Sequence, residues 1–491
     1  MTKEYKNINK KNVATDSMKL SIAQIFSLII NMINIMLLSR YRSVEEYGTY
    51  SQMLMVSSIA VTFLASGFSQ CINYFLANEE NLGKRAKFIK TYYCIVSIAA
   101  MLSGVLSFSL IPFLEKYFDN PGIGKYWFFL LIYPFANVLN NGADRFFILY
   151  HKANQLMLFK LRYGFTTLMT VMLAIVFNWT FTLYLQVFIV VELSFALLIY
   201  YFIYKVTGVI PFGCSCKLIK KILTFAIPMG LAGLVATINS ELDKFVIGGL
   251  TDTETLAIYT NAAKELPIYV FSSSISTVVM PYIVQKIQKG DNRGAADIWN
   301  NSIKLSTYII VFFVIAFYVF APQVISVLYS DKYISGVGVF RVYLFALIFR
   351  LTYYGMILNA QKKTKLILIC SIMTMLSNLI LDIIFFYFIG VTGPAWATVL
   401  SVGVMNILQL VFTTRTIQVH FLDIYPVFHI IRVIIINIIL GIVFYFIQQK
   451  LFIICNLNQN ILTVCLGIIW GIVYFLIIKN KIFKLWKYLN S

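Results

Sequence analysis

The sequence has few charged residues and none of the short motifs typical of common soluble enzymes. Asp, Glu, Lys and Arg make up 12% of its 491 residues, whereas about a quarter of a soluble globular protein is charged. A Walker phosphate loop, an HExxH zinc motif, a GxSxG nucleophile elbow and a dinucleotide-binding glycine motif are all absent from the sequence. The chain therefore does not hydrolyse ATP through a Walker loop, and we expect no catalytic residues and no enzymatic activity.

Metal-binding patterns are missing as well. The seven cysteines are scattered, and the close pair Cys214 and Cys216 has the wrong spacing for zinc and no histidine nearby. The three histidines, His151, His420 and His429, fall in predicted loops or at their edges. We therefore expect no metal site and no cofactor.

Long apolar segments dominate the chain instead. Hydrophobic residues make up 60% of the sequence and aromatic residues 16%, and the mean hydropathy is +0.81. About 20 apolar residues are needed to cross a bilayer as a helix. Fourteen such runs are present, at residues 20–39, 50–76, 88–112, 126–150, 161–178, 181–204, 222–248, 257–282, 304–327, 339–360, 365–389, 394–414, 429–447 and 461–478. The sequence predicts an all-α polytopic membrane protein with about 14 transmembrane helices.

Short polar segments separate these runs, and no loop approaches the size of a domain. We expect no cleavable signal peptide, because the first apolar run is long enough to span and lacks a small-residue cleavage site. The predicted organisation is a basic N-terminal tail (1–19), a six-helix bundle (20–204), a linker (205–221), a second six-helix bundle (222–414), two further helices (415–478) and a basic C-terminal tail (479–491).

The basic residues predict the orientation. With an even number of spans, both termini lie on one side of the membrane. If that side is the cytoplasm, the inside segments hold 29 of the 40 Lys and Arg residues and the outside loops hold seven. Cytoplasmic loops carry such an excess, so both termini are predicted to be cytoplasmic. The net charge of +20 is explained by this topology rather than by binding to nucleic acid.

The chain repeats itself weakly at an offset of 209 residues. Residues 45–50 (EEYGTY) match residues 254–259 (ETLAIY), and residues 148–149 match residues 357–358. Spans one to six fall in step with spans seven to twelve. Because six is even, the two copies have the same orientation, as in transporters built from parallel repeats. Chance similarity between apolar helices is the alternative explanation.

Ten ionisable residues lie inside predicted spans, where they are costly and usually face a cavity or a partner. They are the bases Arg145, Lys244, Lys264 and Arg350 and the acids Asp144, Glu192, Glu241, Asp243, Glu265 and Asp382. If the four bases face one lumen, they form a cationic ladder suited to an anionic head group such as a diphosphate. Arg350 is the strongest candidate, because it is near the midplane and no acid lies in its own span.

Two alternatives remain open for these charges. Asp144–Arg145, Asp243–Lys244 and Lys264–Glu265 are acid–base neighbours that could neutralise each other. The candidates for proton or sodium coupling are Asp382, Glu192, Asp144 and Asp243, because a buried carboxylate can exchange a proton near neutral pH. Each could instead be a counter-ion for a nearby base.

Several segments resemble one family of transporters. Residues 40–51 (RYRSVEEYGTYS) are similar to a signature near the start of polysaccharide transporters. Residues 225–230 (FAIPMG), 239–248 (NSELDKFVIG) and 390–397 (GVTGPAWA) resemble parts of the second half of the same family. The family is the polysaccharide and O-antigen flippases (Wzx-like) of the multidrug/oligosaccharidyl-lipid/polysaccharide (MOP) exporter superfamily. Lys244 departs from the pattern, since many relatives have Arg there.

The resemblance implies a fold and a cargo. It implies two six-helix bundles in a V-shaped, alternating-access transporter like the MATE proteins, with a cationic central cavity. The implied cargo is an undecaprenyl-diphosphate-linked oligosaccharide, such as a repeat unit of O-antigen for lipopolysaccharide, of a capsule or of an exopolysaccharide. Transport would be driven by an H⁺ or Na⁺ gradient in the bacterial inner membrane, with membrane lipids and possible glycan-assembly proteins such as a polymerase as partners.

Three alternatives remain open beside this interpretation. The first is a multidrug or cation antiporter of the same superfamily, and the second is a lipid II flippase. The third is a membrane enzyme such as a glycan polymerase or an acyltransferase. The short outside loops and the lack of a histidine deep in a span argue against the third alternative.

Overall fold

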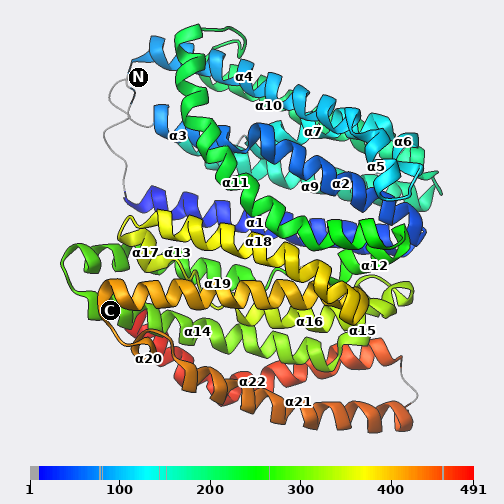
Figure 1. Ribbon diagram of the computed structural model, residues 1–491, viewed down its shortest axis with the longest axis vertical. Helices are drawn as coiled ribbons and strands as arrows, with labels where there is room; N and C mark the ends of the chain where they lie inside the picture. Colours follow the sequence, from blue (N-terminus) through cyan, green and yellow to red (C-terminus); the bar gives the residue numbers. More distant parts are fainter. Residues whose placement is uncertain are drawn as a thin grey trace. The chain divides into compact units, whose positions relative to one another are not determined.

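The computed structural model describes residues 10–76, 79, 81–142, 144–150, 152–264, 266–455 and 458–490. The regular structure in these ranges is entirely helical and includes no strand (Figure 1), which confirms the predicted all-α fold class. The chain forms two compact units. The first runs to Glu241 and includes Gly248–Ala257, and the second comprises Leu242–Ile247 and the chain from Ile258 onward.

The first unit contains ten complete helices and most of an eleventh among its described residues. They are α1 (Lys10–Tyr41), α2 (Val44–Ala65), α3 (Ser69–Leu76), α4 (Leu82–Ser109), α5 (Ile111–Tyr117), α6 (Gly122–Lys125), α7 (Trp127–Gly142), α8 (Asp144–Leu149), α9 (Ala153–Val176), α10 (Phe181–Thr207) and α11 (Cys216–Leu250) as far as Glu241, with the short 3₁₀ helix η1 (Ser66–Phe68) between α2 and α3. The first unit extends past residue 204, the predicted end of the first bundle, and past the predicted linker at 205–221. The predicted domain limits therefore stay a prediction.

The second unit follows the same order of long and short helices. After α12 (Thr253–Ala262), which the two units share, its helices are α13 (Tyr269–Gln288), α14 (Asn292–Val319), α15 (Ala321–Leu328), α16 (Val337–Ile348), α17 (Met356–Ala360), α18 (Thr364–Ile389), α19 (Gly393–Ile417), α20 (Phe421–Ile424), α21 (Val427–Cys455) and α22 (Gln459–Asn490), with η2 (Asp331–Gly336) and η3 (Gly390–Thr392) as short 3₁₀ segments.

The fourteen predicted apolar runs all fall on these helices. Within the described residues, ten helical stretches are long and apolar enough to cross a membrane, and one of them, Thr364–Ile417, contains both α18 and α19. The predicted spans at 257–282 and 339–360 are helical but broken into shorter pieces, and the described residues of 126–150 fall mainly on α7 and α8. Breaks in membrane helices are tolerated where other groups satisfy the freed backbone.

Helix starts repeat at nearly the same offset as the sequence. The Ser43 side chain accepts a hydrogen bond from the Glu46 N–H (3.1 Å), and Asp252 accepts one from the Thr255 N–H (2.7 Å). Such N-caps satisfy one of the free N–H groups of the first helical turn. Ser43 and Asp252 are 209 residues apart, so the same local signal begins α2 and α12.

The next helix of each copy begins in the same way. Asn81 accepts a hydrogen bond from the Lys84 N–H (3.1 Å) at the start of α4, and Asp291 accepts one from the Gly294 N–H (2.9 Å) at the start of α14. These caps are 210 residues apart. The helix order α4, α5, α7, α8, α9, α10 is matched in sequence by α14, α15, α16, α17, α18, α19. The order of elements therefore supports duplication over chance similarity.

The last two long helices have no counterpart in the first copy. In the second unit, α21 and α22 pack against α14 (Figure 1). The buried indole of Trp470 stacks on Phe444 with the ring centroids 5.4 Å apart, and Phe312 stacks on Tyr474 at 5.3 Å. These helices are held by aromatic packing rather than by charge.

Candidate functional site

Two carboxylates are buried in the second unit. Asp243 of α11 is 2% exposed and accepts hydrogen bonds on one carboxylate oxygen from the hydroxyls of Tyr259 (3.0 Å) and Tyr343. Asp382 of α18 is fully buried and accepts a hydrogen bond from the amide of Asn378, one helical turn earlier (3.1 Å). Asp243 interacts electrostatically with Asp382. We call these five residues the acidic cluster.

Two buried oxygen atoms of the acidic cluster lack a hydrogen-bond partner among the described residues. They are the second carboxylate oxygen of Asp382 and the amide oxygen of Asn378. Two ionised carboxylates in one buried site repel each other, and an unpaired buried charge in a membrane is costly. A proton or a small hard cation bound by these oxygens would remove both costs.

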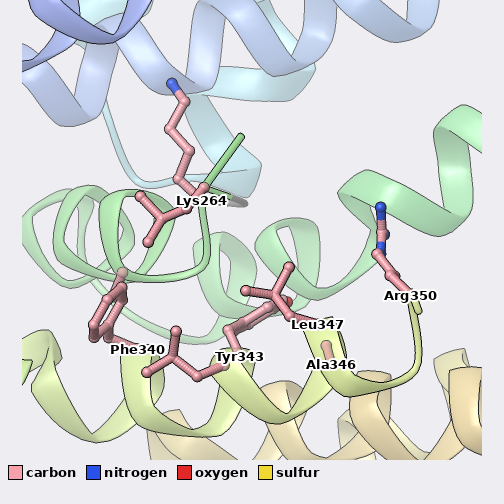
Figure 2. Close-up of a pocket in the computed structure, with 9 residues that line it drawn as sticks. Lys264, Phe340, Tyr343, Ala346, Leu347 and Arg350 are labelled. Atoms are coloured by element: carbon pink, nitrogen blue, oxygen red, sulfur yellow. The ribbon is translucent and has the colours of Figure 1, made fainter. Parts of the chain in front are cut away.

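A second group of residues brings two of the predicted bases together. Lys264 and Arg350 line one small pocket of about 10 Å³, together with apolar and aromatic residues of α16 such as Phe340 and Tyr343. In Figure 2 the two basic side chains stand at separate positions around this pocket and extend in the same direction. The pairing of these two bases was part of the predicted cationic ladder. Glu265 and His151 lie outside the described residues.

Arg350 lies where the helix is broken between α16 and α17. The Ser272 hydroxyl donates to the Arg350 carbonyl (2.7 Å), and the Asn406 amide donates to the carbonyl of the preceding Phe349 (2.7 Å). These bonds satisfy backbone groups freed by the break. The guanidinium carbon is 5.8 Å from the centroid of the Tyr269 ring, a cation–π distance. The break thus gives Arg350 a fixed backbone and a half-buried side chain.

The remaining two bases are not among the residues that line this pocket. Lys244 is half-buried and follows Asp243 on α11; the hydrogen bonds described for Asp243 come from tyrosines. Arg145 is exposed at the start of α8 in the first unit. The acid beside it, Asp144, forms an ion pair with Lys160 of α9 (2.5 Å). That ion pair joins two neighbouring helices of the first unit.

Glu192 of α10 is the buried carboxylate of the first unit. It is 2% exposed. The Tyr163 hydroxyl donates to one of its oxygens (2.5 Å) and the Asn140 amide to the other (2.8 Å). Both carboxylate oxygens of Glu192 therefore accept a hydrogen bond from a neutral donor. In the acidic cluster, by contrast, one carboxylate oxygen of Asp382 accepts none.

Sequence reasoning named the charged members of these sites but missed their neutral partners. Tyr259, Tyr343 and Asn378 are ordinary residues in apolar runs. One signal was available for Asn378, since it precedes Asp382 by four residues on one helix and so shares its face. The tyrosines come from two other helices, and only the packing reveals them.

The fold and these buried groups define a class. Long apolar helices, a duplicated helical scaffold and ionisable side chains enclosed within it describe a multi-pass membrane protein of the transporter type. A family model described as "Polysaccharide biosynthesis protein" matches residues 37–337, which is more than half of the chain. The chain belongs to this family.

Curated relatives match over short stretches. A probable lipid II flippase MurJ of Vibrio cholerae is 27% identical over 200 residues, 37% of each chain. A probable lipid II flippase MurJ of Rhizobium tropici is 25% identical over 112 residues, 23% of this chain and 21% of that protein. The chain thus matches well under half the length of these relatives.

Solved structures match over most of the chain. A lipid II flippase MurJ in an inward closed conformation has a TM-score of 0.67 at 17% identity, covering 93% of this chain and 98% of that one. An inward-facing MATE-family multidrug resistance transporter of the MOP superfamily has a TM-score of 0.65 at 17% identity, covering 82% and 98%. At these identities the likeness shows the fold, and it confirms the predicted MOP-superfamily fold.

Proposed function

We propose that this protein is a flippase that carries a lipid-linked oligosaccharide, joined to its polyprenyl chain by a diphosphate, across the membrane. The observation that carries this proposal is the placement of Lys264 and Arg350 around one pocket inside a helical unit of a polysaccharide-biosynthesis family member. The lipid II flippase relatives support a lipid-linked cargo. The repeat unit of O-antigen, capsule or exopolysaccharide is the cargo class we favour.

The chemistry of the bases suits a diphosphate. An arginine guanidinium donates parallel hydrogen bonds to two phosphate oxygens, whereas a lysine ammonium acts as a compact point charge. In the proposed cycle Arg350 binds the head group, while Lys264, Lys244 and Arg145 neutralise it at other stages. The sugars and diphosphate pass through the protein and the polyprenyl tail stays in lipid. Binding and transport, rather than bond making, are the proposed tasks.

The acidic cluster is the proposed coupling site. Binding of H⁺ or Na⁺ there would neutralise part of the Asp243–Asp382 repulsion, and release would restore it. The leftover oxygens of Asp382 and Asn378 favour this site over Glu192, whose two oxygens have neutral donors. Asp144 also has one oxygen without a hydrogen-bond partner, but its charge is already paired with Lys160. A cation gradient would therefore bias the second unit between two states.

The proposed setting is the bacterial inner membrane with both termini in the cytoplasm. The excess of Lys and Arg in the predicted inside segments supports this orientation. The cargo would move from the cytoplasmic to the periplasmic or outer face. Glycan-assembly proteins such as a polymerase would take up the cargo there, as proposed partners.

A lipid II flippase is the second candidate function, favoured by the curated relatives. In this alternative the cargo also carries a diphosphate, but its sugars differ from those of the first candidate. Complementation separates the two candidates: growth of a strain lacking its lipid II flippase would favour this alternative, and restored surface glycan would favour the first. Protection against cationic dyes without either effect would favour a drug antiporter.

The proposal is tested on Arg350. We expect Arg350→Ala to lower surface-glycan export at least tenfold at unchanged membrane abundance, because loss of a hydrogen bond to a charged group costs ~1.5–3 kcal/mol. Arg350→Lys should recover only part of the export, since it keeps the charge but loses the fork. Arg341→Ala is the matched control, because Arg341 lies on α16, the helix just before Arg350, but contacts Tyr318 and does not line the pocket.

Export would be followed by glycan staining of intact cells and by protection of a labelled polyprenyl-diphosphate oligosaccharide in proteoliposomes. Normal export by Arg350→Ala, or an equal loss in Arg341→Ala, would contradict the assignment of Arg350 to the head group.

A further inference from the structure

A basic pocket lies in the first unit, apart from the sites described above. It has a volume of about 560 Å³ and is lined by α3 and the start of α11, with Tyr74, Phe75, Lys217, Lys220, Lys221, Thr224 and Phe225. We call it the lysine pocket. The three lysines stand at positions i, i+3 and i+4 of α11, which places them on one face of the helix.

The apolar wall of the lysine pocket is built from aromatic rings. Tyr74 stacks on Phe225 with the ring centroids 4.4 Å apart, and Phe75 meets Phe225 edge-on at 5.8 Å. The Lys221 ammonium is 5.7 Å from the Phe75 ring centroid. The Tyr74 side chain is still 65% exposed, so much of its surface remains available to a ligand.

Close backbone contact fixes the two helices that form this pocket. A side-chain carbon at Gly67, just before α3, would collide with the carbonyl oxygen of Ala226 on α11. Further along α11, the hydroxyl of Thr237 donates to that of Thr62 on α2 (3.2 Å). The lysines and the aromatic wall are therefore held in one arrangement before any ligand binds, which lowers the cost of binding.

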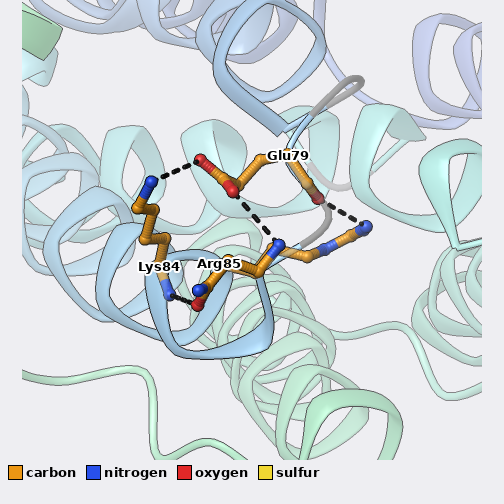
Figure 3. A network of polar contacts seen from close by, with 4 residues as sticks. Glu79, Lys84 and Arg85 are labelled. Carbon is orange, nitrogen blue, oxygen red and sulfur yellow. Dashed lines mark hydrogen bonds and ion pairs between the residues drawn. The ribbon is translucent and has the colours of Figure 1, made fainter.

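Two other basic residues of the first unit, Lys84 and Arg85, have local partners. Figure 3 shows the Glu79 carboxylate 4.0 Å from the Lys84 ammonium and the Arg85 guanidinium donating to the Glu79 carbonyl (3.3 Å). The Arg85 guanidinium also lies 4.9 Å from the Tyr150 ring centroid. These contacts anchor the start of α4.

The lysine pocket differs in charge. Among the described residues, no carboxylate lines it and none of its three lysines forms an ion pair. Like charges at such spacing destabilise a helix. Orientation by positive charge explains lysines in this loop, but it does not require them to share a pocket with exposed aromatic rings. An anion between the lysines would offset the repulsion.

We propose that the lysine pocket is a docking site for the diphosphate of the polyprenyl-linked cargo, occupied before the cargo enters the transport route. This inference rests on the proposed function. The lysines precede the apolar run predicted at 222–248, so they lie at the depth of lipid phosphates. Three ammonium groups match the several charges of a diphosphate better than the single charge of a phospholipid, and the volume leaves room beside it for a first sugar.

The test measures binding of polyprenyl diphosphate to the full-length protein in nanodiscs of zwitterionic lipid. We expect the triple variant K217Q/K220Q/K221Q to bind at least tenfold more weakly than the wild type. The matched control K84Q/K87Q/K90Q removes the same charge from α4 of the same unit without touching the pocket. A triple Arg variant at the pocket positions should retain binding, which separates charge from folding.

Three results would overturn the inference. They are unchanged binding in the pocket variant, an equal loss in the control variant, and displacement of the probe by phosphatidylglycerol at an equal concentration. The last result would assign the pocket to phospholipid. Translocation by the wild type, measured separately in proteoliposomes, tests the proposed function. If the wild type translocates and the pocket variant binds normally, only this inference fails.

Discussion

Replacing Asp382 with Asn gives the most direct test of the acidic cluster. The substitution keeps the size of the side chain and its hydrogen-bonding capacity but removes one of two neighbouring buried carboxylates. If the cluster binds Na⁺, sodium stabilises the folded wild type by ~2.7 kcal/mol at a concentration one hundred times the Kd. For a unit of this size, that corresponds to a rise in Tm of roughly 5–11 °C.

The assay is thermal unfolding of the purified protein in NaCl and in choline chloride at equal ionic strength, repeated at pH 6 and pH 8. We expect the sodium-dependent rise in the wild type and its loss in Asp382→Asn. A proton site predicts instead that stability varies with pH in the wild type and less in the variant. Asp119→Asn is the control, since Asp119 is exposed in the first unit.

Glu192→Gln sharpens the comparison, because it removes the buried coupling candidate of the first unit. Its two oxygens already have neutral donors, so the sodium response should survive. The reasoning would be refuted if Asp382→Asn responded to sodium and to pH in the same way as the wild type.

Two further predictions test the packing of the first unit. Gly67→Ala should lower the free energy of unfolding by ~1–3 kcal/mol, as overpacking does, because the added carbon meets the Ala226 carbonyl. Gly467→Ala is the control and should change stability little, because the space around Gly467 is open. Equal unfolding temperatures of the two variants would contradict the contact at Gly67. The sulfur atoms of Cys94 and Cys214 lie 2.9 Å apart, so a mild oxidant should join them in a disulfide detectable by peptide mass. The hydrogen bond with Cys94 raises the pKa of the Cys214 thiol, so less thiolate is present at pH 7.5. Cys94→Ala removes this bond and should speed alkylation of Cys214; an unchanged rate would count against the bond.

Much of the fold was predictable because apolar length and N-cap chemistry are local signals. Each of the fourteen runs falls on helix, and caps such as Ser43 and Asp252 recur at the offset found in the sequence. The breaks were not predictable. The interruption after α16 depends on Ser272 and Asn406, which come from other helices and satisfy the backbone there.

The candidate site was predictable only in its charged residues. An ionisable side chain in an apolar run is conspicuous, so Asp243, Asp382 and Arg350 could be named directly. Which of them meet depends on the packing of helices far apart in the sequence. In the sequence, Lys217, Lys220 and Lys221 indicate only the orientation of the chain, because their proposed docking role depends on the aromatic wall that α3 and α11 form beside them.

The duplication explains why charge, rather than fold, distinguishes the two units. At the offset of 210 that relates α4 to α14, Arg350 corresponds to Asn140, whose amide holds Glu192. At 209, Asp243 corresponds to Asn34, which donates to Thr167. The same scaffold position thus holds a neutral amide in the first unit and a charged group in the second. Both copies retain the helix caps and helix lengths after duplication, because each copy needs them to fold. A copy retains a buried charge only where a ligand or partner offsets the cost of burying it. The proposed coupling site and the two proposed head-group bases that share a pocket, Lys264 and Arg350, therefore lie in the second unit, whereas the proposed docking site lies in the first unit.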